Sequence, residues 1–494
     1  MTRDPGSPAA AVRRAMAPLA LATAVAALLR LPFLGRASLW HDEAFTVAVV
    51  GAPTPGALWE RIGATESTPP LFYALTWLWT RLAGDGEAAV RTVSAVALIA
   101  AVPVAWAALR RLVGDRAALG AAVVVAVSPL LVEYGLDGRA YGLFVLCALL
   151  STWAFAALLA RDTAAARVRW ALAAAAVVWT HWFGGFLVLA EVVALLWLRP
   201  RAWRRTVAAA AGALAAIALL APLLVAQTGD DRAGFIAATA LAARLEQLVR
   251  QFAMGARVPA TALEAPGLAL FAGAVAVGAA IALRAARGGG RDRAGAGPPP
   301  PEGARALLAL AAVGLLAPLA LAASGLYDRF NARNVLFLLP LAAALAALAL
   351  VRLRGLPLAA YAAIAIAAVL WAQHDWRHRH SDWRAAIAAA RAAAPGAPVI
   401  AATERGAPVA ARYLGRPAAA GPLASDRAVL VVEPVRPVGD RALRPVRDVP
   451  VEAALAAFPQ RRERVVRGFR IVALRAPAPV ALDPAQLPGA TLFP

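Results

Sequence analysis

Residues 31–48, with the sequence LPFLGRASLWHDEAFTVA, mark the point where a long apolar segment ends and a short acidic segment begins. The chain turns at Gly35 and Arg36 and then carries two adjacent carboxylates, Asp42 and Glu43, beside aromatic and histidine side chains. Most of the remaining sequence up to residue 374 is apolar. Two acids directly after the first apolar segment therefore need a structural or a functional explanation.

The composition indicates a membrane protein. The chain has 494 residues, of which 61% are hydrophobic, whereas a soluble protein is about half apolar. Its net charge is +21, and all the basic residues except the few histidines are arginines. Because the arginines cluster in short loops between apolar stretches, they fit the positive-inside rule better than a nucleic-acid partner. The single cysteine, Cys147, excludes an intramolecular disulfide and a cysteine-based zinc site.

Stretches of Ala, Leu and Val of about 20 residues predict a bundle of about eleven membrane-spanning helices. The first is interpreted as a retained helix and not as a signal peptide, because it is long enough to span and lacks a convincing cleavage site. The stretches 168–182 and 183–198 are short for two spans and also fit one long tilted helix. The predicted spans are 15–34, 88–109, 117–134, 141–160, 168–182, 183–198, 206–226, 262–283, 305–324, 334–351 and 356–373.

The arginine clusters orient these spans with the N-terminus in the cytoplasm. The dense clusters then fall on the inner side only if 168–198 is counted as two spans. The inner clusters are Arg13/Arg14, Arg110/Arg111/Arg116, Arg161/Arg167/Arg169, Arg199/Arg201/Arg204/Arg205, Arg284/Arg287/Arg291/Arg293 and Arg352/Arg354. The outer segments are 35–87, 133–140, 182–183, 227–261, 325–333 and the chain after 371. Localisation in the cell membrane, with several passes, follows from this pattern.

Two segments of the first outer loop predict helices that lie in the membrane interface. Residues 69–84, PPLFYALTWLWTRLAG, begin with two prolines and carry four aromatic side chains, which the interface favours. Residues 54–65 predict a second helix of this kind. If 69–84 spanned the membrane instead, every later loop would change sides. Residues 288–304, rich in Gly and Pro, predict a flexible inner linker.

The polar stretch after residue 374 predicts a small extracytoplasmic α/β domain, so the expected domains are 1–374 and 375–494. A helix capped by Ser381 or Asp382 is expected to end near Ala394, before Pro395–Gly396. Further helices are expected over 408–414 and 451–458, and strands over 398–402, 428–433, 464–467 and 470–474 around Gly468. The domain has no Gly-rich phosphate loop and no metal-ligand spacing.

The acid pair has two interpretations. Acids in the first turn of a helix are favoured by the helix dipole, which makes Asp42 and Glu43 an ordinary helix start in a solvated loop. Alternatively, the apolar neighbours Trp40 and Phe45 raise a carboxyl pKa toward the range useful for a general base. Burial at the membrane centre would cost about 2.5–3.5 kcal/mol, so the pair is expected at or outside the interface.

Two further outer loops concentrate charged and aromatic residues. Residues 133–141, EYGLDGRAY, contain Asp137, Arg139 and Tyr141. They fit either interface anchoring with an Asp–Arg pair or a site where the planar guanidinium of Arg139 binds an anion. Residues 327–334, YDRFNARN, place Arg329 and Arg333 on the side where topology disfavours arginine. These arginines either pair with acids or contact a phosphate.

Histidines supply the last candidates. His181 lies in the turn between two short helices, where a structural hydrogen-bonded histidine and a site residue are both plausible interpretations. A second group follows the final span and resembles a metal cluster, but its Arg and Trp neighbours favour a solvated juncture. It consists of His374, Asp375, His378 and His380. No metal site is predicted.

These elements, in this order, resemble the membrane glycosyltransferases of the GT-C superfamily. The most similar branch is the family-39-like group of protein O-mannosyltransferases, aminoarabinose transferases and rhizobial-type lipopolysaccharide sugar transferases. The resemblance covers roughly residues 15–350. It rests on WHDEAFT, STPPLFY, SPLLVEYGLDGRAYGL, THWFG and RFNARNVLFLLP. Thr68 stands where many relatives have His or Lys before the Pro-Pro pair, so one phosphate contact of those relatives is in doubt, and His41 has no assigned role.

The resemblance implies a transfer reaction and roles for its residues. Asp42 is expected to act as general base on an acceptor hydroxyl, supported by Glu43, with inversion at the sugar. Arg139 with Arg329 or Arg333 is expected to hold the departing phosphate. The remaining substrate-site candidates are Asp137, Tyr141 and His181. The implied donor is a polyprenyl-phosphate-linked sugar, with a hexose such as mannose expected. The expected partners are membrane lipid and a protein, lipid or glycan acceptor. A divalent metal has no support in the sequence.

Two other functions remain open at this stage. A transporter or flippase of a lipid-linked anion needs the outer arginines but no base, and it tends to carry polar groups and broken helices near the membrane midplane. A scaffold without activity is the third alternative. It leaves the placement of Asp42 and Arg139 unexplained.

Overall fold

The computed structural model describes residues 8–228, 234–258, 262–288, 299–403, 405–435, 443–446 and 455–494. The chain forms two compact units. The first comprises Met1–Leu34, Val49–Ala256 and Thr261–Val369, and the second comprises Gly35–Ala48, Arg257–Ala260 and Leu370–Pro494. The segment that carries the acid pair therefore belongs to the second unit, although it lies near the N-terminus of the chain.

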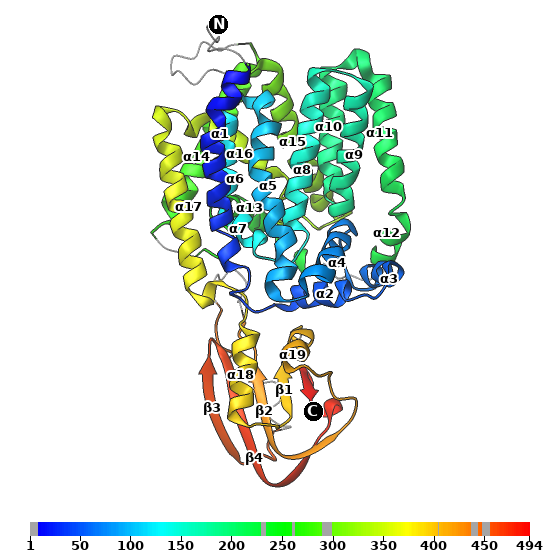
Figure 1. The fold of residues 1–494 in the computed structure, drawn as a ribbon, viewed down its shortest axis with the longest axis vertical. Coiled ribbons are helices and arrows are strands. Elements are labelled where there is room, and N and C mark those ends of the chain that lie inside the picture. Colours follow the sequence, from blue (N-terminus) through cyan, green and yellow to red (C-terminus); the bar gives the residue numbers. More distant parts are fainter. Residues whose placement is uncertain are drawn as a thin grey trace. The chain divides into compact units, whose positions relative to one another are not determined.

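The first unit is a helix bundle (Figure 1). Two helices, α2 (His41–Val50) and α17 (Leu356–His374), cross from one unit to the other along the chain. The remaining helices of the bundle are α1 (Pro8–Leu28), α3 (Pro55–Thr65), α4 (Leu71–Ala83), α5 (Glu87–Val113), α6 (Asp115–Val127), α7 (Pro129–Gly135), α8 (Tyr141–Ala160), α9 (Ala164–Thr180), α10 (Gly184–Leu198), α11 (Trp203–Ala218), α12 (Ala221–Thr228), α13 (Leu241–Met254), α14 (Glu264–Ala286), α15 (Pro301–Ala323) and α16 (Leu338–Leu350).

The predicted membrane bundle is confirmed. Among the described residues, 6 helices are long and apolar enough to cross a membrane, and two bent pairs raise the number to as many as 8. The bent pairs are α6 with α7, at 54°, and α11 with α12, at 55°. The shorter apolar helices α10 and α16 add to these. Residues 168–198 form two helices, α9 and α10, joined by a turn, and not one long tilted helix.

Residues 35–87, predicted as the first outer loop, contain short helices, as the sequence predicts. In α3, the Thr54 hydroxyl accepts a hydrogen bond from the backbone N–H of Ala57 at 3.2 Å and caps the helix. Residues 69–84 contain α4, which has 13 residues. At about 1.5 Å per residue, this helix is shorter than a hydrocarbon core of about 30 Å. Its length favours the predicted interfacial helix, and it lies with α3 at one end of the bundle (Figure 1).

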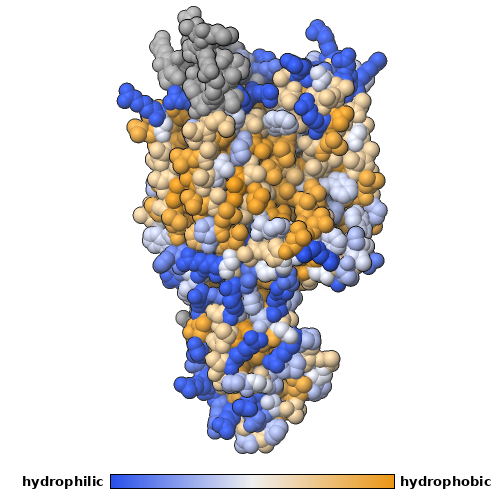
Figure 2. Space-filling view, in the orientation of Figure 1, coloured by the Kyte–Doolittle hydropathy of each residue, from blue (hydrophilic) through white to orange (hydrophobic). Residues whose placement is uncertain are grey.

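The surface of the bundle carries a broad apolar band bounded by hydrophilic side chains (Figure 2). Large apolar side chains such as Leu21, Leu172 and Leu219 are exposed on this surface, as expected where a helix faces lipid. Small residues bring the helices close together inside it. A Cβ on Gly142 of α8 would lie 2.6 Å from the carbonyl oxygen of Ser94 on α5. This close packing through small residues is typical of membrane bundles.

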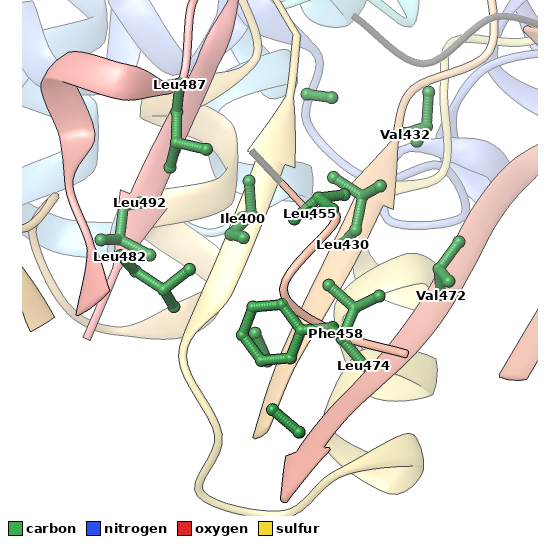
Figure 3. Close-up of a cluster of buried hydrophobic side chains, with 13 residues drawn as sticks. Ile400, Leu430, Val432, Leu455, Phe458, Val472, Leu474, Leu482, Leu487 and Leu492 are labelled. Carbon is green, nitrogen blue, oxygen red and sulfur yellow. The ribbon is translucent and has the colours of Figure 1, made fainter. Parts of the chain in front are cut away.

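The second unit contains a five-stranded sheet in the order β3–β4–β2–β1–β5. The strands are β1 (Val399–Ala402), β2 (Leu423–Val432), β3 (Gln460–Val466), β4 (Phe469–Leu482) and β5 (Ala490–Phe493), and the helices are α18 (Trp383–Ala393) and α19 (Ala407–Leu414). The pair β1 and β2 is parallel, with α19 between them in sequence, and the other pairs are antiparallel. One face buries a cluster that includes Ile400, Leu430 and Leu474 (Figure 3). The other face packs against α18.

The sequence predicts much of this unit. Asp382 caps α18 by accepting a hydrogen bond from the N–H of Ala385 at 3.2 Å. Arg467 and Gly468 both have positive φ at the turn between β3 and β4, which suits the tight hairpin expected there. The short strand β5 is not predicted. Most of the predicted linker 288–304 and the first half of the predicted helix 451–458 lie outside the described residues.

Candidate functional site

Glu43 supports the start of helix α2. Trp40 precedes the helix, and its carbonyl accepts the hydrogen bond from the N–H of Ala44 at 2.9 Å. The carboxylate of Glu43 reaches back and accepts from the N–H of Trp40 at 3.3 Å. A glutamate at this third helical position makes half of a capping box. Glu43 is also fully buried, so its position fits the structural interpretation of a helix-start acid.

Asp42 differs from its neighbour because it is accessible. Its side chain is 27% exposed, and its Oδ1 lies 3.3 Å from Nε2 of His41. The ring of His41 packs edge-on against Trp40, with centroids 4.5 Å apart. A partly exposed carboxylate beside an imidazole has the chemistry of a proton acceptor.

In the first unit, Arg139 forms a bidentate ion pair with Glu66. The NH1 and NH2 groups of Arg139 donate to the two carboxylate oxygens of Glu66 at 3.0 and 2.8 Å. The two side chains are only 11% and 3% exposed. The hydroxyls of Tyr73 and Thr68 lie 2.9 Å apart beside this pair, and Tyr73 also bonds Glu66. Arg139 is therefore held in a fixed plane by this ion pair.

Glu66, the partner of Arg139, is not predicted from the sequence. Its only local signal is an acid placed just before Thr68 and the Pro-Pro pair. Arg139 lies 73 residues away along the chain, so no periodic pattern connects the two. Thr68, where the resemblance put a phosphate contact in doubt, supports Tyr73 through a hydrogen bond.

Several predicted residues gather around a cluster of aromatic rings in the first unit. His181 stacks on Phe144 with centroids 4.6 Å apart, and Tyr141 lies 6.0 Å from the same imidazole. The positive charges of Arg333 and Arg139 lie close enough to the imidazole of His181 to influence its ionisation. The charges of Arg333 and Asp137 act on Tyr134, which packs against Tyr141 at 4.6 Å. The structure thus brings together five predicted residues: Asp137, Arg139, Tyr141, His181 and Arg333.

Asp328 is held by an arginine that was not predicted. Arg244 on α13 donates to both oxygens of the Asp328 carboxylate, at 2.6 and 2.7 Å, and to the carbonyl of Phe330 at 2.8 Å. These bonds fix the loop that carries Arg329 and Arg333. Arg329 directly follows Asp328 in the chain, so it lies at the start of this loop. Arg244 gives no sequence signal beyond being a cation in an amphipathic helix.

The histidines after the last span do not assemble a metal site. Asp375 accepts hydrogen bonds from the Nε and NH2 groups of Arg377, and this contact holds the pKa of Asp375 below its usual value. The ring of His380 stacks on Trp40 at 3.9 Å. Within the described ranges, no group of three or more His, Cys, Asp or Glu side chains is arranged to hold a metal ion.

The predicted site residues therefore fall into two groups. Asp42 and Glu43 belong to the second unit, and the arginine and aromatic cluster belongs to the first. The chain is similar over most of its length to the crystal structure of ArnT from Cupriavidus metallidurans bound to undecaprenyl phosphate. The TM-score is 0.56 at 15% identity, and the match covers 92% of this chain and 97% of that one. The chain has the fold of this ArnT structure.

The other comparisons cover parts of the chain. Residues 67–225 match the family model described as dolichyl-phosphate-mannose-protein mannosyltransferase. This range includes Arg139 and His181 but not the acid pair. An oligosaccharyltransferase structure from Archaeoglobus fulgidus matches with a TM-score of 0.43 at 14% identity, over 77% of this chain and 56% of that one. No curated protein sequence matches significantly. The fold class predicted from the sequence is confirmed, and the family match over residues 67–225 agrees with the GT-C resemblance.

Proposed function

We propose that this membrane protein transfers a sugar, with mannose as the first candidate, from a polyprenyl phosphate to an acceptor hydroxyl. The observation that carries the proposal is that the two adjacent acids differ in burial, on an ArnT-like fold. Glu43 is buried in the helix start, whereas the Asp42 carboxylate is accessible. The ArnT structure of this fold holds undecaprenyl phosphate, which supports a lipid-linked donor for this chain as well.

The proposed reaction uses these residues as follows. The Asp42 carboxylate takes the proton of the acceptor hydroxyl as the hydroxyl oxygen bonds to the anomeric carbon. The bond between that carbon and the phosphate oxygen breaks, and the polyprenyl phosphate leaves with the electron pair. Attack from the face opposite the leaving group inverts the anomeric configuration. Arg139 and Arg333 are the proposed partners of the negative charge that develops on the departing phosphate, and Arg329, in the same loop as Arg333, is the alternative to Arg333.

The substitution Asp42→Asn tests the proposed base. The assay uses membranes that contain the full-length protein, mannosyl polyprenyl phosphate as donor and endogenous acceptors. Loss of a general base is expected to lower transfer by about 10²- to 10⁴-fold. Asp426→Asn is the matched control, because Asp426 lies on β2 in the same unit and pairs only weakly with Arg427, at 3.9 Å. Near-normal transfer by Asp42→Asn, at equal expression, would remove Asp42 from the mechanism.

We place the reaction at the extracytoplasmic face of the cell membrane. The arginine clusters on one side of the predicted spans support a cytoplasmic N-terminus and an extracytoplasmic second unit. A protease cleavage site inserted after Ala394 tests this placement when protease is added to intact cells. Cleavage from outside is expected, and protection until the cells are opened would reverse the orientation.

A transporter of a lipid-linked anion is the second candidate. Two observations favour it: the bent pairs α6/α7 and α11/α12, and the buried Glu191 on α10, which accepts hydrogen bonds from Ser151 and Trp170 at 2.7 and 2.8 Å. Broken helices and buried acids are common in transporters. Reconstituted vesicles separate the two functions, because a transporter moves mannosyl polyprenyl phosphate between leaflets even when it carries Asp42→Asn.

A further inference from the structure

The backbone just before the acid pair is anchored to residues from the far end of the chain. We name residues 35–48 the acid segment. The hydroxyl of Ser38 donates to the carbonyl of Ser381 at 2.9 Å and accepts from the N–H of Trp383 at 3.0 Å. Ser38 is buried. Its hydroxyl therefore links the acid segment to the start of α18 in both hydrogen-bonding directions.

The next two residues are anchored as well. The N–H of Leu39 donates to the hydroxyl of Tyr413 on α19 at 2.8 Å. The ring of Trp40 lies flat on the ring of His380, with centroids 3.9 Å apart and an interplanar angle of 13°. Three consecutive residues thus have partners in the second unit, and the last of them stands two positions before Asp42.

The anchors are themselves fixed to the sheet. The indole N–H of Trp383 donates to Glu433, directly after β2, at 3.1 Å. The hydroxyl of Thr403, directly after β1, donates to the other oxygen of Glu433 at 2.6 Å. The ring of Trp383 also packs edge-on against Phe469 on β4, with centroids 5.0 Å apart. The ends of the two parallel strands therefore determine where α18 begins, and through it where Ser38 sits.

We propose that Ser38, Tyr413 and His380 are positioning residues that hold Asp42 in its reactive orientation. This inference rests on the proposed function, since it assigns the second unit a task in the same transfer reaction. A general base must stand within hydrogen-bonding distance of the proton it takes. Displacement of a reacting group by about 1 Å costs up to about 10²-fold in rate. Three neighbouring anchors supply the rigidity that this placement requires.

The test uses the full-length protein in membranes and three variants that each remove one anchor. They are Ser38→Ala, Tyr413→Phe and His380→Ala. Each is expected to lower the turnover number about tenfold or more, while the KM for mannosyl polyprenyl phosphate changes less than about twofold. His380→Phe keeps a ring against Trp40 and is expected to restore most of the turnover. Ser425→Ala is the control, because in the described part of the chain the Ser425 hydroxyl bonds the nearby backbone of Arg427.

A structural measurement accompanies the assay. Hydrogen–deuterium exchange in the peptide that covers the acid segment is expected to speed up in Tyr413→Phe and Ser38→Ala, but not in Ser425→Ala, because the Leu39 amide loses its acceptor or its anchor. If the anchor variants exchange and turn over like the wild type while Asp42→Asn is inactive, the positioning role is wrong and the proposed function stands. If Asp42→Asn stays active, the proposed function fails, and the positioning of Asp42 for transfer fails with it.

Discussion

Arg244 and Asp328 meet through two parallel hydrogen bonds of 2.6 and 2.7 Å, although 84 residues separate them along the chain. The guanidinium is 4% exposed and the carboxylate 23%. The pair joins α13 to the loop that carries Arg329 and Arg333. A charge-assisted bidentate contact of this kind fixes direction as well as distance. Arg244 therefore holds the loop in one conformation and fixes the positions of Arg329 and Arg333.

Replacement of Arg244 by Met is expected to destabilise the protein by about 2–3 kcal/mol, because it leaves the partly buried Asp328 carboxylate without its main donor. Thermal unfolding in detergent measures the change. Arg377→Met is the control, since Arg377 pairs with Asp375 at the surface and an exposed pair contributes about 1 kcal/mol or less. Equal shifts in the two variants would contradict the structural role of Arg244.

The same pair predicts a pH dependence. The hydrogen bonds from Arg244 hold the pKa of Asp328 below its ordinary value. A carboxyl whose pKa is lowered on folding stabilises the protein above its unfolded pKa of about 4, and this stabilisation is lost as the pH falls through the folded pKa. Between pH 6 and pH 3, the melting temperature of the wild type is expected to fall more steeply than that of Arg244→Met. Parallel curves would show that the pair contributes nothing to acid sensitivity.

Arg139→Lys is expected to behave as a disruptive change although it keeps the charge. Lysine cannot reproduce the two parallel bonds to Glu66, and the carboxylate is almost fully buried. We expect a loss of about 1–3 kcal/mol in stability and a fall in transfer of about tenfold or more, measured in membranes with mannosyl polyprenyl phosphate. Arg110→Lys provides the matched control, because its partner Asp115 is exposed. A fully active Arg139→Lys variant would show that the bidentate geometry is dispensable.

Gly278 and Gly273 lie on the same helix, α14. Their replacement by Ala is expected to change the stability of the protein in opposite directions. A Cβ on Gly278 would collide with the backbone carbonyl of Leu345 on α16, whereas one on Gly273 meets nothing within 4 Å. Gly278→Ala is expected to cost about 1–3 kcal/mol or more through overpacking. Gly273→Ala is expected to be neutral or slightly stabilising, because alanine favours the helix. Melting temperatures in detergent compare the two, and equal values would mean that α14 and α16 separate readily.

Local patterns explain why the helices were predictable. Long apolar runs have few alternatives to a membrane helix, and the arginine clusters resolved 168–198 into α9 and α10. In the second unit, Asp382 and Gly468 marked a helix start and a hairpin. The strand β5 has 4 residues and is formed by pairing with β1, so its own sequence gives little signal.

The partners within the candidate site were not predictable in the same way. Glu66 with Arg139, and Arg244 with Asp328, are pairs that only the packed bundle brings together. The grouping of the acid segment with the second unit depends on Ser38, whose partner Ser381 lies 343 residues away. A hydroxyl in a loop has many possible acceptors, and nothing near Ser38 in the sequence selects one.

The anchoring of the acid segment has a consequence for the order in which the protein is made. A ribosome synthesises Ser38 and Leu39 early, but the residues that hold them follow 343 and 374 positions later. Chains fold progressively as they emerge, so a nascent chain carries the whole helix bundle before its acid segment acquires these partners. Chains released before Tyr413 is added would keep the spans but lack Tyr413 and the strands β2 to β5, and incomplete copies inserted in the membrane would be poor catalysts.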